Sequence, residues 1–340
     1  MRKKISGSVL LLFIILFVYS CKSGQYDADI SGIEAEVSIK RLEVDLFTTD
    51  PSALPATTEG LKKKYGGFLQ LFSYVINTGD VNDSSFTDFL VRFSTDKLNT
   101  EVYSSVMKVY PDLSDTEKKL GMAFRYYRYY FPENKIPAVY SCISGFNNSI
   151  ITGDSILGIG LDRYLGAESD YYPQLGIYKY LSDRMTPAHL VPDCIYGWGS
   201  SEWDFASAGY RDDNVLSEMI HEGKLRYYQK CMLPETPDEL LFGFTGDQIK
   251  FCRNNEDQMW LYLLEHDILF STDQLVIRKL TGEAPFTSFF TNESPGRAAA
   301  WIGFRIVEAY MERNKGITLA ELMKDTDVQG ILEKARYSPK

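Results

Sequence analysis

His221 and Glu222 come nearest in this chain to a known catalytic motif. They lie in the segment Met-Ile-His-Glu-Gly-Lys-Leu, within a stretch predicted to be helical over residues 212–232. In the HExxH motif of zinc peptidases, two histidines four residues apart on one helical face bind Zn²⁺, and the glutamate between them activates the bound water. Here Leu225 stands where the second histidine is needed, and Lys224 would bring a cation beside the metal. The sequence therefore keeps only the first half of the motif.

A simpler interpretation of this helix needs no metal. His221 is then a half-buried histidine, and Glu222 is solvated or pairs with Arg226 one turn later on the same face. Because the chain holds only three histidines, a site with two of them would need His221 to meet His189 or His266 from distant segments.

Two other catalytic patterns are incomplete. Residues 197–201 do not form the G-x-S-x-G turn of a serine hydrolase, because no serine stands between two correctly spaced glycines. Gly158 and Gly160 lack the third glycine of a dinucleotide-binding loop, since Arg163 occupies its place.

The elements that would position these residues follow from the spacing of apolar side chains. Alternation over residues 37–46 predicts a strand, and the Thr/Pro-rich residues 48–58 predict a loop. Helical spacing then continues to about residue 131, with Ser114 and Glu117 as a capping box. Short apolar runs predict a small sheet at residues 138–140, 150–151 and 156–161. Further helices are expected at 212–232, at 247–265, from a Ser294 cap with Pro295 in the first turn, and from residue 319. The fold class predicted is α+β, mostly helical with a small central sheet.

The N-terminus predicts export and lipid attachment. Three cations open the chain, residues 9–18 are wholly apolar, and Cys21 follows a small residue. This is the pattern of a secretory signal, and Val-Tyr-Ser-Cys resembles the lipobox of bacterial lipoproteins, in which the cysteine carries acyl chains such as palmitate. We therefore expect residues 1–20 to be a signal peptide, residues 21–32 a lipidated cysteine with a tether, and residues 33–340 a single α+β domain.

The amino-acid composition limits the classes of molecule that the protein could bind. The formal charge is −10 and falls to about −13 once the three cations of the signal are removed, which argues against a nucleic-acid partner. Aromatic residues make up 14% of the chain, and runs such as residues 126–131 are assigned either to the core or to a surface for a protein partner. The other four cysteines permit two disulfides or four buried thiols: Cys142, Cys194, Cys231 and Cys252.

Several segments together resemble one family, the gliding motility-associated lipoproteins of the GldB type in Bacteroidetes. The matching segments are residues 158–166, 219–228 and 233–238, Glu256 with Trp260, and residues 294–303. The family-motif residues within or beside them are Gly223, Lys224, Trp260, Pro295, Gly296, Arg297, Trp301 and Gly303.

The resemblance implies a distant relation to a zinc-protease group with a zincin-like core, in which a small sheet precedes the metal-site helix. It also places Glu256 where such an enzyme draws a third zinc ligand. One histidine and one glutamate do not complete a site, so the sequence predicts an exported pseudo-zincin without catalytic residues, metal or cofactor.

The function expected is that of a non-enzymatic, lipid-anchored envelope protein. It would assemble or hold protein partners in the outer-membrane machinery of gliding and type IX secretion. Because no acidic run follows Cys21, we expect it to face the periplasm. The alternative is a membrane-tethered, zincin-like metallopeptidase with zinc on His221 and Glu256, a further ligand from His189 or His266, and Glu222 as the catalytic base.

Overall fold

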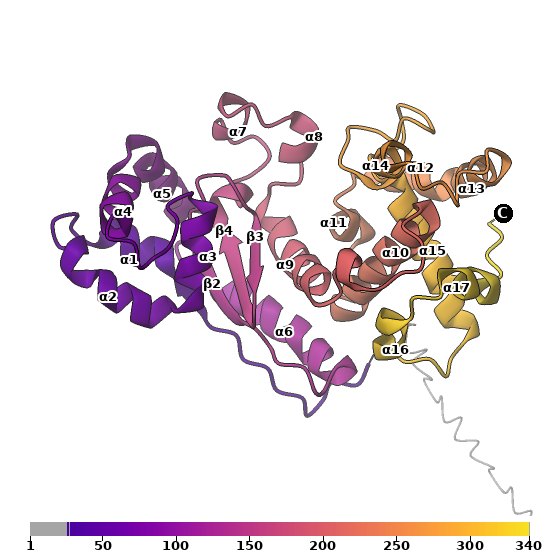
Figure 1. Ribbon diagram of the computed structural model, residues 1–340, viewed down its shortest axis with the longest axis horizontal. Helices are drawn as coiled ribbons and strands as arrows, with labels where there is room; N and C mark the ends of the chain where they lie inside the picture. The colour runs from indigo at the N-terminus through magenta and orange to yellow at the C-terminus, as the bar shows by residue number, and fades with distance from the viewer. Residues whose placement is uncertain (1–25, 27, 340) are drawn as a thin grey trace, which may run out of the picture.

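Four strands form one small mixed sheet near the middle of the computed structural model, which describes residue 26 and residues 28–339 (Figure 1). Their order across the sheet is β1 (Ile39–Arg41), β2 (Ala138–Cys142), β4 (Ile156–Gly160) and β3 (Ile150–Gly153). The first three are parallel to one another, and β3 runs antiparallel to β4 at the edge. The sheet predicted from residues 138–161 is confirmed.

The sheet is covered on one face by α3 (Gly67–Val75). Phe68 stacks on Tyr140 with ring centroids 4.5 Å apart, and a Cβ atom on Gly158 would lie 2.4 Å from the Phe68 ring. Gly158 therefore lets an aromatic ring reach the strand, and a Cβ atom on Gly160 would lie 2.1 Å from the Asn148 carbonyl oxygen. Close packing accounts for both glycines without a dinucleotide.

A first group of helices lies between β1 and β2 in sequence and mostly to one side of the sheet (Figure 1). They are α1 (Leu42–Thr48), α2 (Leu54–Tyr65), α3, α4 (Phe86–Thr95), α5 (Lys97–Val109) and α6 (Ser114–Tyr130). The strand predicted over 37–46 is wrong beyond Arg41, and the loop predicted over 48–58 ends at Leu54. In both places apolar side chains recur at helical spacing toward a second core cluster that includes Leu42, Leu46 and Leu54. The capping box predicted at Ser114 is also absent, because the Glu117 carboxylate accepts the backbone N–H of Ile39 instead.

A second helical group follows the sheet. It comprises η1 (Leu161–Tyr164), α7 (Tyr171–Gln174), α8 (Lys179–Ser182), α9 (Pro187–Glu202), η2 (Phe205–Ser207), α10 (Val215–Met232), α11 (Asp238–Phe242), α12 (Gly246–Asn254), α13 (Glu256–Glu265), α14 (Gln274–Thr281), α15 (Ala298–Arg313), α16 (Leu319–Lys324) and α17 (Val328–Ala335). The helix expected at 212–232 is confirmed as α10, and the one expected from residue 319 is confirmed as α16.

Two helix predictions in this group are corrected. The helix expected over 247–265 is two helices. Helix α12 ends at Asn254, and the side chain of the next residue, Asn255, donates to the Phe251 carbonyl. Ser294 does not cap α15. Its hydroxyl bonds within the preceding turn, and α15 begins after Arg297, which has a left-handed backbone with φ of 59°.

The aromatic run and the cysteines belong mainly to the core. Tyr127 and Phe131 are buried and pack with Tyr228 from α10, while Tyr129 is exposed. All four cysteines that the structure describes are buried, and none of them forms a disulfide. Of the two states left open for them, the structure shows buried thiols.

The predicted signal peptide and Cys21 lie outside the described residues. The predicted tether is not free where the structure describes it, because Tyr26 packs against Tyr227 and donates to Glu308, and Arg125 of α6 bonds the carbonyls of Ile30 and Ile33. Within residues 28–339, no helix combines the length and the apolar character that crossing a bilayer requires.

Candidate functional site

Helix α10, which carries the partial motif, crosses α15 with backbone against backbone. A Cβ atom on Gly223 would lie 2.3 Å from the carbonyl of Gly303, and one on Gly303 would lie 1.8 Å from the carbonyl oxygen of Met219. Neither gap is one that a side chain can open by changing rotamer. The two family-motif glycines therefore fix the position of α10, and with it the direction in which each side chain of the motif points.

His221 points to a closed, aromatic side of α10. Its Nδ1 lies 3.0 Å from the hydroxyl of Tyr210, and the ring of Phe205 meets the imidazole edge-on at 5.2 Å. Only 6% of the residue is exposed. Burial lowers the pKa of His221 to about 4, and the neighbouring Lys224 ammonium adds to this effect. His221 is thus a neutral, packed histidine at neutral pH.

Lys224 belongs to the same closed side. Its ammonium donates to the carbonyl of Asp325 at 2.6 Å and to the Tyr210 hydroxyl at 3.1 Å. Burial lowers the pKa of Lys224 to about 8. The family-motif lysine therefore ties α10 to the turn between α16 and α17.

Glu222 points the other way, toward α9. The Tyr196 hydroxyl lies 2.8 and 3.0 Å from its two carboxylate oxygens, and the Arg226 guanidinium lies 4.0 Å from one of them. Arg226 in turn stacks on the Tyr196 ring at 3.9 Å. The predicted pairing of Glu222 with Arg226 is confirmed, as a weak ion pair.

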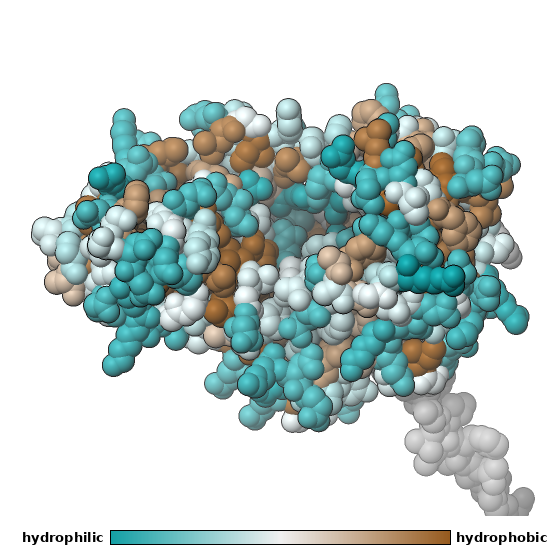
Figure 2. Space-filling view, in the orientation of Figure 1, coloured by the Kyte–Doolittle hydropathy of each residue, from teal (hydrophilic) through white to brown (hydrophobic). Residues whose placement is uncertain are grey.

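Glu222 lines a cleft of about 510 Å³ between the start of β3, helices α8 to α11, and the loops before α15. Figure 2 shows this hollow near the centre of the visible face, with hydrophilic residues on its walls. Its charged lining residues are four arginines and three carboxylates: Arg163, Arg184, Arg226, Arg297, Asp193, Glu222 and Glu283.

Each carboxylate of the cleft already has a partner. Arg184 donates to Glu283 at 2.7 Å and Arg297 lies 3.3 Å from it. Burial acts to raise the pKa of Glu283, but these two arginines outweigh it and hold the pKa below its usual value. The Tyr164 hydroxyl donates to Asp193 at 2.9 Å, and burial raises the pKa of that carboxyl.

Two of the arginines are less completely satisfied. Arg163 donates to the Ser149 hydroxyl and the Phe146 carbonyl, and no carboxylate within residues 28–339 forms an ion pair with it. Arg226 is 5% exposed, and its Nε finds no hydrogen-bond partner in the described part of the chain. The cleft as a whole has an excess of positive charge in a chain of formal charge −10.

The residues suggested for zinc do not come together. Glu256 is engaged by Trp301 at 2.9 Å, Tyr337 at 2.8 Å and Arg305 at 3.2 Å, away from both sides of α10 described above. His189 bonds Thr186, and His266 stacks on Tyr262. Over residues 28–339, no three histidine, cysteine or acidic side chains are grouped so that they could hold a metal ion. The donor set does not fit zinc.

The other family-motif residues hold the loops around α15. Trp260 packs edge-on against Tyr337, and the Pro295 carbonyl accepts two bonds from Thr287. A Cβ atom on Gly296 would lie 2.0 Å from the carbonyl oxygen of Ala284. Of this set, only Arg297 also lines the cleft.

Sequence reasoning missed most of the cleft. Helix α9, which supplies Asp193 and Tyr196, was not predicted, and Arg184 and Glu283 lie in loops without a recognisable motif. Arg163 falls within the family segment 158–166, where the sequence marks it only as a departure from a glycine motif. Its charge beside a predicted strand end was the one signal available.

Comparison with known proteins gives a family and no closer relative. A family model described as gliding motility protein GldB matches residues 23–339, which is nearly the whole chain. A search of curated proteins and a search of solved structures each returned no match.

Proposed function

This chain belongs to the gliding motility protein GldB family, and from that membership we propose that it is a lipid-anchored envelope protein that binds partners and does not catalyse a reaction. The observation that carries the proposal is the separation of His221 from Glu222. The imidazole bonds Tyr210 on one side of α10, and the carboxylate bonds Tyr196 on the other. A zinc peptidase needs the two groups at one metal ion.

We propose further that the core is a zincin-like fold that has lost its metal role. The order of elements supports this, because the sheet strands β2 to β4 precede the motif helix α10. We propose that Cys21 carries the acyl chains and that the protein faces the periplasm at the outer membrane, where it takes part in the gliding or secretion machinery. Two acyl chains hold a protein at a membrane stably, whereas one does so only marginally.

The test of the non-enzymatic role is metal content together with motility. We expect the mature chain, purified without chelator, to hold far less than one zinc atom by elemental mass spectrometry. His221→Gln should then support colony spreading as well as the wild-type chain does in a gliding host that lacks its own copy. Near-stoichiometric zinc that is lost in His221→Gln, together with lost spreading, would overturn the proposal in favour of a peptidase.

Lipid attachment is tested separately. Cys21→Ser should abolish metabolic labelling with an alkyne analogue of palmitate and move the protein from the membrane to the soluble fraction. The matched control is Cys142→Ser, in a buried thiol of β2, which should leave labelling unchanged. Labelling that persists in Cys21→Ser would show that the anchor lies elsewhere.

A further inference from the structure

Strand β3 offers an open edge on the side away from β4. The N–H of Gly160 donates to the carbonyl of Ser149 at 2.9 Å, which makes Ser149, Ile151 and Gly153 the residues that bond β4. In an antiparallel ladder the alternate residues point their N–H and C=O groups the other way. Those residues are Ile150 and Thr152, and in the described sheet no strand lies on that side.

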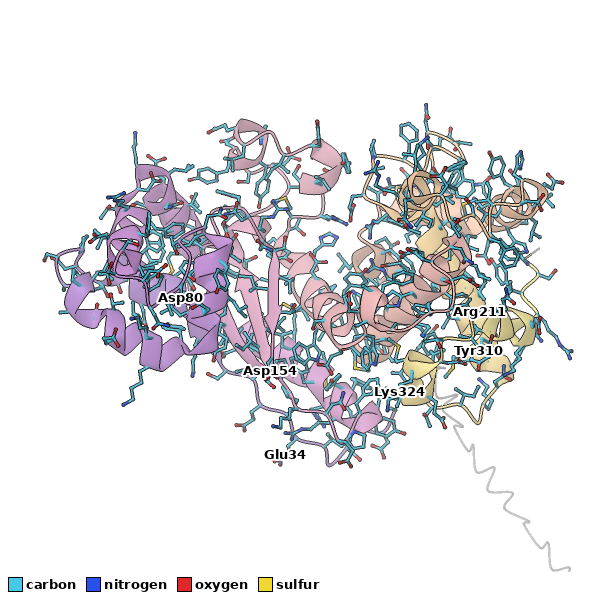
Figure 3. The ribbon with its side chains drawn as sticks, viewed as in Figure 1. Glu34, Asp80, Asp154, Arg211, Tyr310 and Lys324 are labelled. Atoms are coloured by element: carbon cyan, nitrogen blue, oxygen red, sulfur yellow. The ribbon has the colours of Figure 1, made fainter. Side chains whose placement is uncertain are left out.

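Helix α9 packs beside this edge, and a cavity opens at each end of β3. The Ile150 side chain rests on Gly197, where a Cβ atom would come within 2.7 Å of it. At the start of β3 this cavity is the arginine-lined cleft, to which Ile150 and Gly197 both contribute. At the other end a second cavity of about 530 Å³ is lined by Thr152, Ser201 and Glu202, among other residues. Figure 3 marks the far end, with Asp154 at the turn between β3 and β4.

The start of β3 carries an unpaired positive charge. Arg163 stands at this end, held by the Ser149 hydroxyl at 3.2 Å, and its positive charge has no ion-pair partner among the described residues. The unbonded Nε of Arg226 lies in the wall of the same cleft. A planar carboxylate is the group that a guanidinium binds best, through two parallel hydrogen bonds.

We propose that an extended peptide segment of a partner protein adds to β3 as a further strand and places a carboxylate at Arg163. This inference rests on the proposed partner-binding function and names where the partner binds. The backbone of the peptide would bond the free N–H and C=O groups of Ile150 and Thr152, as in other cases of strand addition to a sheet edge. The four residues of β3 span about 13 Å at roughly 3.3 Å per residue, so about four peptide residues would pair with the strand and one or two more would reach the Arg163 end.

Strand direction identifies two sources for the carboxylate. A peptide antiparallel to β3 ends near the start of β3, which is the Arg163 end, so its C-terminal carboxylate can reach the arginine. An acidic side chain near that end supplies the same chemistry. Both sources present the same planar anion, so one experiment tests them in two separate arms.

The probe is a display library of random hexapeptides, selected against the full mature chain. One half of the library has a free C-terminus, and the other half is followed by a polar tail so that only acidic side chains are available. Selected peptides are made synthetically with a free or an amidated C-terminus, and with an acidic residue or its amide counterpart at the last position, and are measured by fluorescence anisotropy. Amide hydrogen exchange of the wild-type chain is followed with and without peptide.

Thr152→Pro is the decisive variant. Proline removes the outward N–H of Thr152 and leaves the bonds from Ile151 and Gly153 to β4 in place, as is tolerated on edge strands. Its matched control, Thr152→Ala, keeps that N–H. We expect Thr152→Pro to weaken peptide binding by at least about tenfold and Thr152→Ala by less than about threefold.

Arg163 tests the carboxylate. Arg163→Gln should weaken acidic peptides by about tenfold and leave their amide analogues within about twofold, while Arg163→Lys should fall between. Enrichment in the free-terminus half alone identifies a C-terminal carboxylate, and enrichment in both halves identifies an acidic side chain. Peptide should also slow exchange of the Ile150 and Thr152 amides, a reading that does not depend on any variant folding.

Three results would overturn the inference. They are a library that yields no binder, binders that ignore both Thr152→Pro and Arg163→Gln, and bound peptide that leaves the Ile150 and Thr152 amides unprotected. None of these touches the proposed non-enzymatic role, which fails only if zinc and His221 prove necessary. The two failures are therefore distinguishable.

Discussion

The two sides of α10 differ in how far their polar side chains are buried and hydrogen-bonded. On one side His221 and Lys224 are packed among aromatic rings and bonded to Tyr210 and to the Asp325 carbonyl. On the other side Glu222 and Arg226 face a polar cleft and contact each other only at 4.0 Å. We call the first the sealed side, because its polar groups are buried and hydrogen-bonded. On the second, open side the Nε of Arg226 has no hydrogen-bond partner in the described part of the chain.

This difference explains how one helix can retain a motif without its chemistry. Two adjacent helical residues point about 100° apart, so they act on one ligand only when the ligand sits between them. Here the space beside His221 is filled by Phe205 and Tyr210. What remains open is the side of Glu222, where arginines from four elements or loops converge.

The largest loss of stability is expected from a change at Gly223, because this residue fixes the position of α10 and so of both its sides. Gly223→Ala would force a methyl group against the carbonyl of Gly303, and backbone atoms cannot rotate away. We expect a loss of about 3 kcal/mol or more in the free energy of unfolding, measured by urea denaturation.

The matched control for this variant is Gly60→Ala. Gly60 lies in α2, where an added Cβ meets no atom within 4 Å. Alanine there should be neutral or stabilise by up to about 1 kcal/mol, because it restricts the unfolded chain and favours helix. Equal effects of the two variants would mean that the helices do not meet at Gly223.

The next largest effect is expected at a buried lysine of the sealed side, and it is compared with the effect at a lysine on the protein surface. Lys224→Ala removes a buried ammonium and leaves the Asp325 carbonyl without that donor. A lost hydrogen bond to a charged group predicts a cost of about 2–3 kcal/mol. Lys62→Ala, which removes a surface ion pair with Glu59, should cost less than about 0.5 kcal/mol in the same denaturation measurement. A Lys224→Ala value near that of Lys62→Ala would contradict a sealed, satisfied side.

The sequence predicts an element of the fold well where the apolar spacing within that element alone determines its type. The strands at residues 138–161 and the helix α10 were predicted because their apolar spacing is unambiguous over one element. Apolar alternation predicts a strand as far as residue 46, but the structure has α1 from Leu42. The same apolar residues fit both periods, and only α2 to α4 supply the core that they face. Local spacing could not decide between the two.

The candidate site was harder, because its members come from separate segments. The sequence indicated that Glu222 could pair with Arg226, four residues apart on one helix, and the structure has that pair. It gave no means of knowing that Tyr196 would bond Glu222, or that Arg184 and Arg297 would share Glu283. The glycines of the family motif were visible, but their reason lies in a contact across 80 residues between α10 and α15.

The smallest effect concerns pH and compares His221 with Glu218, which lies in the first turn of α10. Burial, with the nearby carboxylates of Glu222 and Asp213, raises the pKa of Glu218 to about 7. A carboxyl whose folded pKa is raised favours the folded state at low pH, and that stability is lost as pH rises from about 4.5 through 7. The pKa of His221, lowered to about 4, works oppositely, so its contribution is lost as pH falls from about 6.5 toward 4.

The two contributions oppose each other between pH 4.5 and 6.5, so each variant should reveal the other group. Glu218→Gln should make the protein more sensitive to acid, and His221→Gln should make its stability fall as pH rises toward 7. Full burial would give each shift about 3 kcal/mol, and solvent screening of these partly buried groups reduces this to about 1–2 kcal/mol. Urea midpoints measured from pH 4 to 8 test this. Parallel profiles for the two variants would show that burial does not shift the pKa values of Glu218 and His221 in opposite directions.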